Sequence, residues 1–311
     1  MTSTGYHAEN GQEKTAFIAI VGRPNVGKSS ILNQLLGQKV AIVSSKPQTT
    51  RTRIMGVLTK ADIQLVFIDT PGMHKPKTQL GDYMVRAVRE SVSGVDACLL
   101  VAQAGKAPAD MELLLVEKFK ALGIPAVLAL NKIDLVKNKE DLMQNIADYS
   151  KLFDFSAVVP VSALHANGMQ ALENELKKQA RQGRHLFEGD TLTDQPERVL
   201  AAEMIREKIL RQLNHEIPHG TAVIVEKMQA REESGIMDMD AVIYCERESH
   251  KGIIIGKNGA MLKRIGSYAR QDMEAFFACK INLWLWVKVK EDWRNRRGIL
   301  RSLGYDSDYF R

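Results

Sequence analysis

The sequence predicts two domains of different class: an α/β domain with a mostly parallel sheet and helices on both faces, followed by a smaller α+β domain. Three observations lead to this prediction. The 311 residues are about twice the length of a typical domain. Short apolar runs alternate with amphipathic stretches over residues 15–180, as in a parallel sheet with crossover helices. After residue 196 the order changes to helix, two strands, helix and strand.

The elements of the first domain follow from its hydrophobic pattern. The predicted strands are short and bounded by turn-forming or charged residues, as buried strands are: Phe17–Val21, Ile63–Ile68, Ala97–Val101, Ala126–Leu130 and Val158–Val161. The predicted helices lie between or after them: Ser29–Leu36, Thr78–Ser91, Asp110–Leu122, Lys139–Phe153 and Gly168–Ala180.

A linker rich in Gly, Thr and Asp separates the two domains. We predict a flexible tail at 1–14, the first domain at 15–180, the linker at 181–196 and the second domain at 197–311. The elements predicted for the second domain are a helix at Glu197–Leu213, strands at Thr221–Met228 and Met239–Glu246, a helix at Ala260–Phe277 and a strand at Ile281–Lys290.

Composition narrows the class of protein. Hydrophobic residues make up 45% and charged residues 26%, as in ordinary globular proteins. No apolar run reaches the ~18 residues of a membrane span, and residues 1–14 lack the apolar core of a signal peptide. The three cysteines are too few and scattered for a disulfide framework or a zinc site. We therefore expect a cytoplasmic protein.

Positive charge is concentrated near the C-terminus. The net charge is only +6, but residues 251–301 contain twelve Lys/Arg against four Asp/Glu, whereas residues 181–250 contain nine against fourteen. The positive electrostatic field of residues 251–301 favours a polyanionic partner such as RNA. A basic face that is merely solvated would be the alternative if this stretch held no RNA-binding motif.

A phosphate-binding motif follows the first predicted strand. Residues 22–29 read G-R-P-N-V-G-K-S, which fits G-x-x-x-x-G-K-[ST] between a strand and a helix. Backbone N–H groups of such a loop surround phosphate oxygens, and the helix N-terminus adds partial positive charge. Lys28 is expected to neutralise the β and γ phosphates and Ser29 to bind Mg²⁺. The predicted phosphate contacts are Gly22, Asn25, Val26, Gly27, Lys28, Ser29 and Ser30.

Three further motifs follow predicted strands and together indicate a guanine nucleotide: Asp69-Thr-Pro-Gly72, Asn131-Lys-Ile-Asp134 and Ser162-Ala-Leu164. Asp69-Thr-Pro-Gly72 places a carboxylate for Mg²⁺ and the Gly72 N–H for the γ-phosphate. Asp134 can accept two hydrogen bonds from guanine, whereas adenine lacks this donor pair. The predicted guanine contacts are Asn131, Lys132, Asp134, Ser162 and Ala163.

These motifs resemble translation-factor-class small GTPases, and with the basic C-terminal domain they resemble the Era family from about Phe17 to Tyr305. The resemblance implies a P-loop GTPase domain followed by a type II KH domain. It also implies GTP hydrolysis coupled to binding of 16S rRNA near its 3′ end, in assembly of the 30S subunit. A monomer with weak peripheral membrane association is implied as well. Gln48-Thr49-Thr50-Arg51 is similar to the family's switch I, with Thr50 the expected ligand of Mg²⁺ and γ-phosphate and Thr49 its competitor.

The residue that activates water is less evident. Ras-like GTPases use a Gln after the D-x-x-G segment, whereas this chain has Met73 there, so we expect slow intrinsic hydrolysis. The resemblance suggests a K⁺ ion held by Asn25; otherwise Asn25 is simply a turn residue that suits the loop. The residues predicted to act in catalysis are Lys28, Thr50, Gly72 and Asn25. A GTP-gated binding module without appreciable turnover, and a KH domain that binds tRNA or the large subunit, remain alternatives.

The second domain contains the G-x-x-G loop typical of KH domains, Gly256-Lys-Asn-Gly259, after the apolar run Ile253–Ile255. Such loops clamp the backbone of about four nucleotides. The predicted RNA contacts are Gly252, Ile255, Gly256, Lys257, Asn258, Gly259, Lys263, Arg264, Arg270 and Lys288. Arg294, Arg296, Arg297 and Arg301 are expected to contact phosphates.

The last predicted strand, Ile281–Lys290, alternates small or branched apolar residues with tryptophans and polar residues. One face carries core residues, and the other carries Trp284 and Trp286 beside Lys288 and Lys290. The tryptophans could stack on bases, or the segment from Trp293 onward could fold over that face; the second interpretation is slightly favoured.

Overall fold

The computed structural model describes residues 13–46, 49–71, 79–80, 84 and 94–305. They divide into two compact units. The first comprises the described residues of 13–40, 53–71 and 94–194, and the second those of 41–52, 79–84 and 195–305. The domain boundaries predicted at residues 14, 180 and 196 stay predictions.

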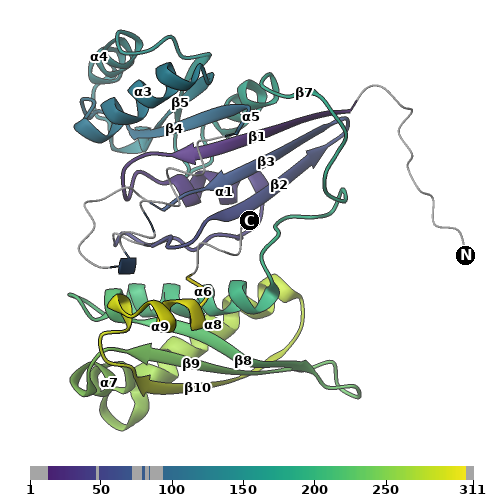
Figure 1. The fold of residues 1–311 in the computed structure, drawn as a ribbon, viewed down its shortest axis with the longest axis vertical. Coiled ribbons are helices and arrows are strands. Elements are labelled where there is room, and N and C mark those ends of the chain that lie inside the picture. The colour runs from purple at the N-terminus through teal and green to yellow at the C-terminus, as the bar shows by residue number, and fades with distance from the viewer. Residues whose placement is uncertain (1–12, 47–48, 72–78, 81–83, 85–93, 306–311) are drawn as a thin grey trace, which may run out of the picture. The chain divides into compact units, whose positions relative to one another are not determined.

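The first unit has a mostly parallel sheet (Figure 1). Its strands are β1 (Lys14–Val21), β2 (Ile54–Lys60), β3 (Ile63–Asp69), β4 (Ala97–Gln103), β5 (Ala126–Asn131), β6 (Ala157–Val161) and β7 (Arg181–Gln182). The order is β2-β3-β1-β4-β5-β6, with β2 antiparallel to β3 and β7 antiparallel to β1. Crossovers leave β1 in opposite directions, so the loop after β1 lies where ligands bind in open α/β sheets.

Helices cover both faces of this sheet. They are α1 (Lys28–Leu36), α3 (Asp110–Leu122), α4 (Lys139–Ser150) and α5 (Met169–Lys177), with a 3₁₀ turn at Ile133–Leu135. α3 and α4 bury Leu115, Phe119 and Tyr149 against one face, while α1 and α5 pack on the other. Figure 1 shows α3 and α4 on one side of β1 and α1 on the other. The α/β prediction is confirmed.

Two strands of the first unit are absent from the predicted set. β2 is an edge strand whose period-2 pattern is interrupted by Gly56, where a Cβ would lie 2.8 Å from side-chain carbons of Leu32 and Leu36. β7 lies within the predicted linker, where two exposed residues give no hydrophobic pattern. Of the predicted helix Thr78–Ser91, only Gln79, Leu80 and Met84 are described, and they are helical.

The second unit is an α+β domain (Figure 1). Its helices are α6 (Glu197–Gln212), α7 (Glu248–Ile255), α8 (Ala260–Phe277) and α9 (Arg297–Ser302), with 3₁₀ turns at Pro218–Gly220, Lys257–Gly259 and Trp293–Asn295. Its strands are β8 (Ala222–Ala230), β9 (Met237–Cys245) and β10 (Ile281–Val289), in the order β10-β9-β8. β9 is antiparallel to β8 and parallel to β10. Helix α7 is absent from the predicted set because eight residues with three isoleucines and a glycine carry little helical signal.

The two faces of this small sheet differ. Helices α6 and α8 contribute buried side chains such as Ile205 and Met273 to a core with the odd-numbered residues of β9 and β10. The even-numbered residues, including Trp284 and Trp286, point to the opposite face because strand side chains alternate. No helix among the described residues combines the length and apolar content needed to cross a bilayer.

The segment before β2, residues 41–52, belongs to the second unit and packs on its other elements. Arg51 is 1% exposed and donates to the carbonyl oxygens of Thr221 at 2.6 Å and His219 at 2.7 Å. Its guanidinium lies 5.7 Å from the centroid of the Trp293 ring. The buried Arg206 of α6 donates to the Thr49 carbonyl oxygen. Part of the predicted switch I is therefore held by the helix and C-terminal segment of the second unit.

Candidate nucleotide-binding and RNA-binding sites

The loop between β1 and α1 depends on two glycines. Gly22 has φ +148° and Gly27 has φ +101°, a region that favours glycine. A Cβ on Gly22 would lie 2.3 Å from the Val101 carbonyl oxygen, and one on Gly27 2.2 Å from Asn131 Nδ2. The backbone of this loop therefore approaches both neighbouring segments too closely for any side chain, which fits a loop whose N–H groups must face phosphate.

Lys28 points back over this loop. It is 6% exposed, and its Nζ donates to the carbonyl oxygens of Gly22 at 3.1 Å and Arg23 at 2.9 Å. Burial lowers the pKa of the Lys28 ammonium to about 8, while the Asp69 carboxylate acts in the opposite direction. A phosphate dianion beside Nζ would favour the charged form further, so this lysine is placed for phosphate neutralisation.

Side-chain oxygens suited to a hard cation lie at the C-terminal end of β3 and the start of α1. Ser29 Oγ donates to Asp69 Oδ2 at 2.7 Å, and Asp69 is fully buried. Thr70 Oγ1 donates to the Ile20 carbonyl oxygen at 2.9 Å, which ties the end of β3 to β1. A hydroxyl and a carboxylate beside a phosphate-binding loop are the donors that Mg²⁺ prefers, so the residues present fit this metal.

The segments predicted to bind guanine come together at the ends of β5 and β6. Asn131 Nδ2 donates to the Val26 carbonyl oxygen at 2.8 Å, and Asn131 Oδ1 accepts from the Ala163 N–H at 3.0 Å. The same side chain therefore joins the phosphate loop to the loop after β6. Ser162 Oγ donates to Asp134 Oδ1 at 2.5 Å. This bond orients the carboxylate predicted to read guanine.

One contact of the phosphate loop has no signal in the sequence. Arg23 Nε donates to Glu112 Oε1 at 2.5 Å, and the other oxygen of Glu112 accepts from the Ala109 N–H at 3.0 Å. Glu112 is fully buried on α3, so Arg23 compensates a charge that would otherwise be costly to bury. The partners are 89 positions apart in the sequence, so motif analysis does not reveal this pair.

The structure says less about the other residues predicted to act in catalysis. Asn25 lies in the loop with φ +63°. Thr50 is 6% exposed and belongs to the second unit, so its role as a metal ligand stays a prediction. Gly72 and Met73 lie outside the described residues.

The G-x-x-G segment forms an exposed turn between α7 and α8. Gly256, Asn258 and Gly259 have φ of +73°, +50° and +76°. A Cβ on Gly259 would meet nothing within 4 Å, so the backbone there is open to a phosphate group. Lys257 and Asn258 are exposed at the tip, and the N-terminus of α8 follows directly.

The predicted RNA-binding side chains do not all gather at this turn. Lys263 and Arg264 are exposed in the first two turns of α8, whereas Arg270 lies about 15 Å along that helix from its first residue, Ala260. Gly252 and Ile255 lie on α7. Lys288 lies on the face of the sheet opposite α8, so it belongs to another surface than the loop.

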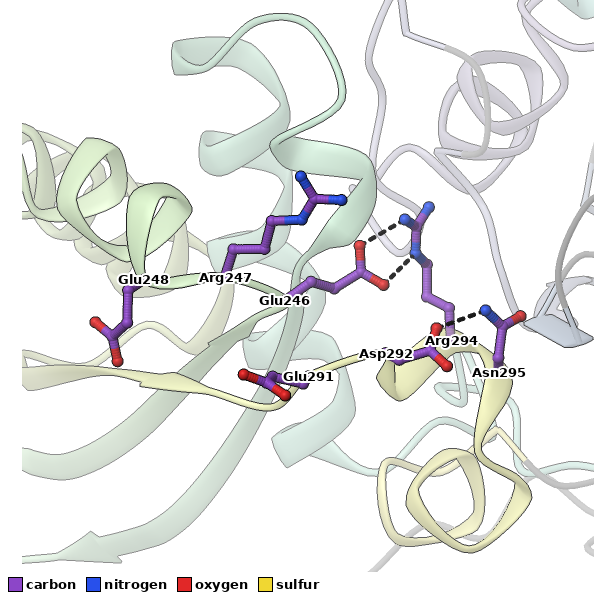
Figure 2. A pocket seen from close by; sticks show the side chains of 7 residues that line it. All are labelled: Glu246, Arg247, Glu248, Glu291, Asp292, Arg294 and Asn295. Carbon is purple, nitrogen blue, oxygen red and sulfur yellow. Dashed lines mark hydrogen bonds and ion pairs between the residues drawn. The ribbon is translucent and has the colours of Figure 1, made fainter.

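A hollow of about 520 Å³ lies beside the C-terminal ends of β9 and β10 (Figure 2). It is lined by Glu246, Arg247, Glu248, Glu291, Asp292, Arg294 and Asn295. Figure 2 shows Glu246 and Arg294 facing each other, with bonds of 2.9 and 2.5 Å. Arg294 is therefore engaged in a bidentate ion pair within the protein, and the expectation that it contacts phosphate does not fit this geometry.

Comparison with known proteins agrees with this arrangement. A family model described as 50S ribosome-binding GTPase matches residues 17–132, and a KH domain model matches residues 216–294. The GTPase Era of Ruminiclostridium cellulolyticum is 49% identical, over 95% of this chain and 98% of its own. That of Clostridioides difficile is 48% identical, over 94% and 99%.

Two solved structures extend the similarity to the fold. Both are 37% identical to this chain, have a TM-score of 0.89 and cover 94% of this chain and 99% of their own. One is an Aquifex aeolicus Era variant bound to GDP·AlF₄⁻. The other is Era in complex with MgGDPNP and nucleotides 1506–1542 of 16S ribosomal RNA. On this identity over nearly the whole chain, the protein belongs to the Era family of GTP-hydrolysing enzymes with a C-terminal KH domain.

Proposed function

We propose that this GTPase couples GTP binding and hydrolysis to recognition of 16S rRNA near its 3′ end during assembly of the 30S subunit. The observation that carries the proposal is that one chain contains two sites. In the first, Asn131 joins the phosphate loop to the segments predicted to bind guanine. The second is the open G-x-x-G turn. A relative 37% identical to this chain has been solved with a GTP analogue and a 16S rRNA segment together.

The chain's own groups would carry out distinct tasks. Lys28 and the backbone N–H groups of residues 25–30 hold the β and γ phosphates, and Asp134 reads the guanine. Ser29 and Asp69, with Thr50 from switch I, would hold Mg²⁺, which when bound offsets negative charge on the phosphates. Catalysis then rests on positioning and charge neutralisation, and with Met73 in place of glutamine we propose a slow intrinsic rate.

Asp134→Asn is expected to weaken GTP binding by at least about 100-fold, because a carboxylate accepting two N–H donors is replaced by a group with one acceptor. Titration with a fluorescent GTP analogue, competed by GTP and ATP, measures the change. Asp141→Asn, an exposed aspartate at the start of α4, is the matched control. A GTP affinity within twofold of the natural chain would refute the guanine-reading role.

The coupling is tested by turnover of the full chain in K⁺ and Na⁺ buffers, with and without an RNA of 16S nucleotides 1506–1542. We expect RNA to stimulate hydrolysis, and K⁺ to support a faster rate than Na⁺ through Asn25. Gly259→Asp should abolish the stimulation, because it adds both negative charge and strain at the predicted phosphate contact. Gly235→Asp is the matched control, since Gly235 also has positive φ, +64°, and open surroundings.

Each outcome has a separate meaning. Equal rates in K⁺ and Na⁺ would remove the ion from the mechanism but leave the RNA coupling intact. Rates unaffected by RNA, together with equal RNA affinity in the GDP state and with a non-hydrolysable GTP analogue, would refute the coupling itself.

A further inference from the structure

The outer face of the β8–β10 sheet exposes two large aromatic side chains. Trp284 and Trp286 are 57% and 58% exposed, whereas Trp293, the third tryptophan of the chain, is fully buried. Neighbouring apolar side chains in contact with water are unfavourable and mark interaction surfaces. We call Trp284 and Trp286 the tryptophan platform.

The described part of the C-terminal segment folds over one end of this face but does not reach these two rings. Trp293 and Leu300 pack in a cluster with Ala222 and Tyr244, at the far end of the sheet. In the register of β10 on β9, Tyr244 lies opposite Lys288, two and four residues beyond the platform. The described part of the C-terminal segment therefore covers Tyr244 and leaves both tryptophans accessible.

The platform has the form of two consecutive stacking surfaces. Residues two apart on a strand share a face and lie about 7 Å from each other. β10 is at one end of the sheet order, so the rings stand along an edge strand, with Asp240 and Val242 opposite them on β9. An extended polymer with regularly spaced flat groups fits this geometry.

Charge on this face changes along β10. Asp238, on β9 opposite Asn282 near the start of β10, accepts from Arg231 at 2.7 Å and from Asn282 at 2.9 Å. Lys288, just beyond the platform, has a 56% exposed side chain, and its Nζ lies 3.8 Å from a carboxylate oxygen of Glu226. Such an exposed and loosely paired ammonium can exchange its partner for a phosphate at little cost.

The platform is also close in the fold to the predicted phosphate clamp. Helices α7 and α8, which flank the Gly256–Gly259 turn, both pack against β10. A strand of RNA held at that turn therefore has only the edge strand to pass before it reaches the outer face.

From these observations we propose that the tryptophan platform stacks successive bases of single-stranded RNA continuing from the G-x-x-G turn, and that Lys288 contacts the phosphate next to them. Aromatic side chains on a sheet face stack bases in other RNA-binding domains, without strict sequence preference. The proposal rests on the proposed RNA binding and adds a second contact surface on the same domain.

Tryptophan fluorescence of the full chain tests the proposal directly. Because Trp293 is buried, a base that stacks on Trp284 or Trp286 should quench the accessible part of the emission and protect it from iodide. The probe is an RNA of 16S nucleotides 1506–1542, compared with four-nucleotide fragments that can fill only the G-x-x-G clamp. We expect quenching by the long RNA alone.

Affinity measurements on variants give an independent readout. Trp284→Ala and Trp286→Ala should each weaken binding of the long RNA by about 5- to 100-fold, as loss of one stacked base does, and leave binding of the short fragments unchanged. Trp286→Phe should retain most of the affinity because it keeps an aromatic face. Leu186→Ala, which removes an apolar side chain with the same 57% exposure in the other unit, should have no effect.

The outcomes separate this proposal from the proposed function. If the natural chain and Gly259→Asp both fail to bind the long RNA, the RNA-binding function fails and the platform proposal with it. If the natural chain binds but emission and the affinities of both alanine variants are unchanged, only the platform proposal is overturned. Emission that responds to ribosomal proteins but not to RNA would also overturn it, because the occupant would then be protein.

Discussion

Replacing Lys28 with alanine is expected to lower the rate of GTP hydrolysis by about 10²- to 10³-fold, the effect of removing one preorganised charge at a reacting phosphate. The side chain is 6% exposed, and carbonyl oxygens at 3.1 and 2.9 Å hold its Nζ over the phosphate loop. The charge is thus positioned before the nucleotide binds. Water molecules in its place would have to reorient to stabilise the same phosphate charge. Single-turnover hydrolysis at saturating GTP measures the effect separately from binding.

Lys120→Ala is the matched control for this experiment. Lys120 lies on α3 with a 48% exposed side chain paired to Glu117 at 2.9 Å, and surface pairs of this kind contribute little. A loss of less than about tenfold for Lys28→Ala, in a variant with an unchanged melting temperature, would mean that backbone N–H groups and the metal suffice for charge neutralisation.

Replacing Trp293 with alanine is expected to lower the free energy of unfolding by about 3–5 kcal/mol, as for other large buried aromatic side chains. Its ring is fully buried and stacks on Tyr305 with centroids 5.9 Å apart, and its Nε1 donates to the Gly220 carbonyl oxygen at 2.9 Å. The ring also supports the buried guanidinium of Arg51. Removing it leaves a cavity and an arginine without its aromatic neighbour.

Denaturant unfolding followed by far-UV circular dichroism measures this loss, and Trp286→Ala is the matched control. Trp286 is 58% exposed, so its removal should cost less than about 1 kcal/mol. Equal losses for the two variants would show that Trp286 is also part of the core, against both this prediction and the tryptophan platform. Because Arg51 belongs to the predicted switch I, Trp293→Ala should also loosen that segment.

The motifs predicted to form the nucleotide site could be recognised in the sequence because their chemistry is local. Glycines at 22 and 27, the lysine and serine that follow, and Asp69, Asn131 and Asp134 at strand ends occupy fixed positions relative to strands that hydrophobic pattern reveals. The predicted tie between Asn131 and the phosphate loop is present as a bond of 2.8 Å to the Val26 carbonyl oxygen. The G-x-x-G turn was predictable for the same reason.

Contacts between distant segments, in contrast, were decided only by the tertiary structure. No local pattern pairs Arg23 with Glu112, or Arg294 with Glu246, because an ion pair across the fold depends on where two elements meet. The same holds for the edge strand β2 and the short helix α7, whose residues have weak preferences until neighbours pack on them. Packing also decided that Trp293 is buried while Trp284 and Trp286 are exposed.

The sequence by itself therefore determined the class of both domains and the class of nucleotide, since these follow from periodicity and from motifs along the chain. Only the tertiary structure decided which tryptophans face water, which arginines are held within the protein, and that Thr49 and Arg51 belong to the second unit. The physical reason is that burial and ion pairing are properties of segments brought together by folding, and their energies depend on neighbours that the local sequence does not specify.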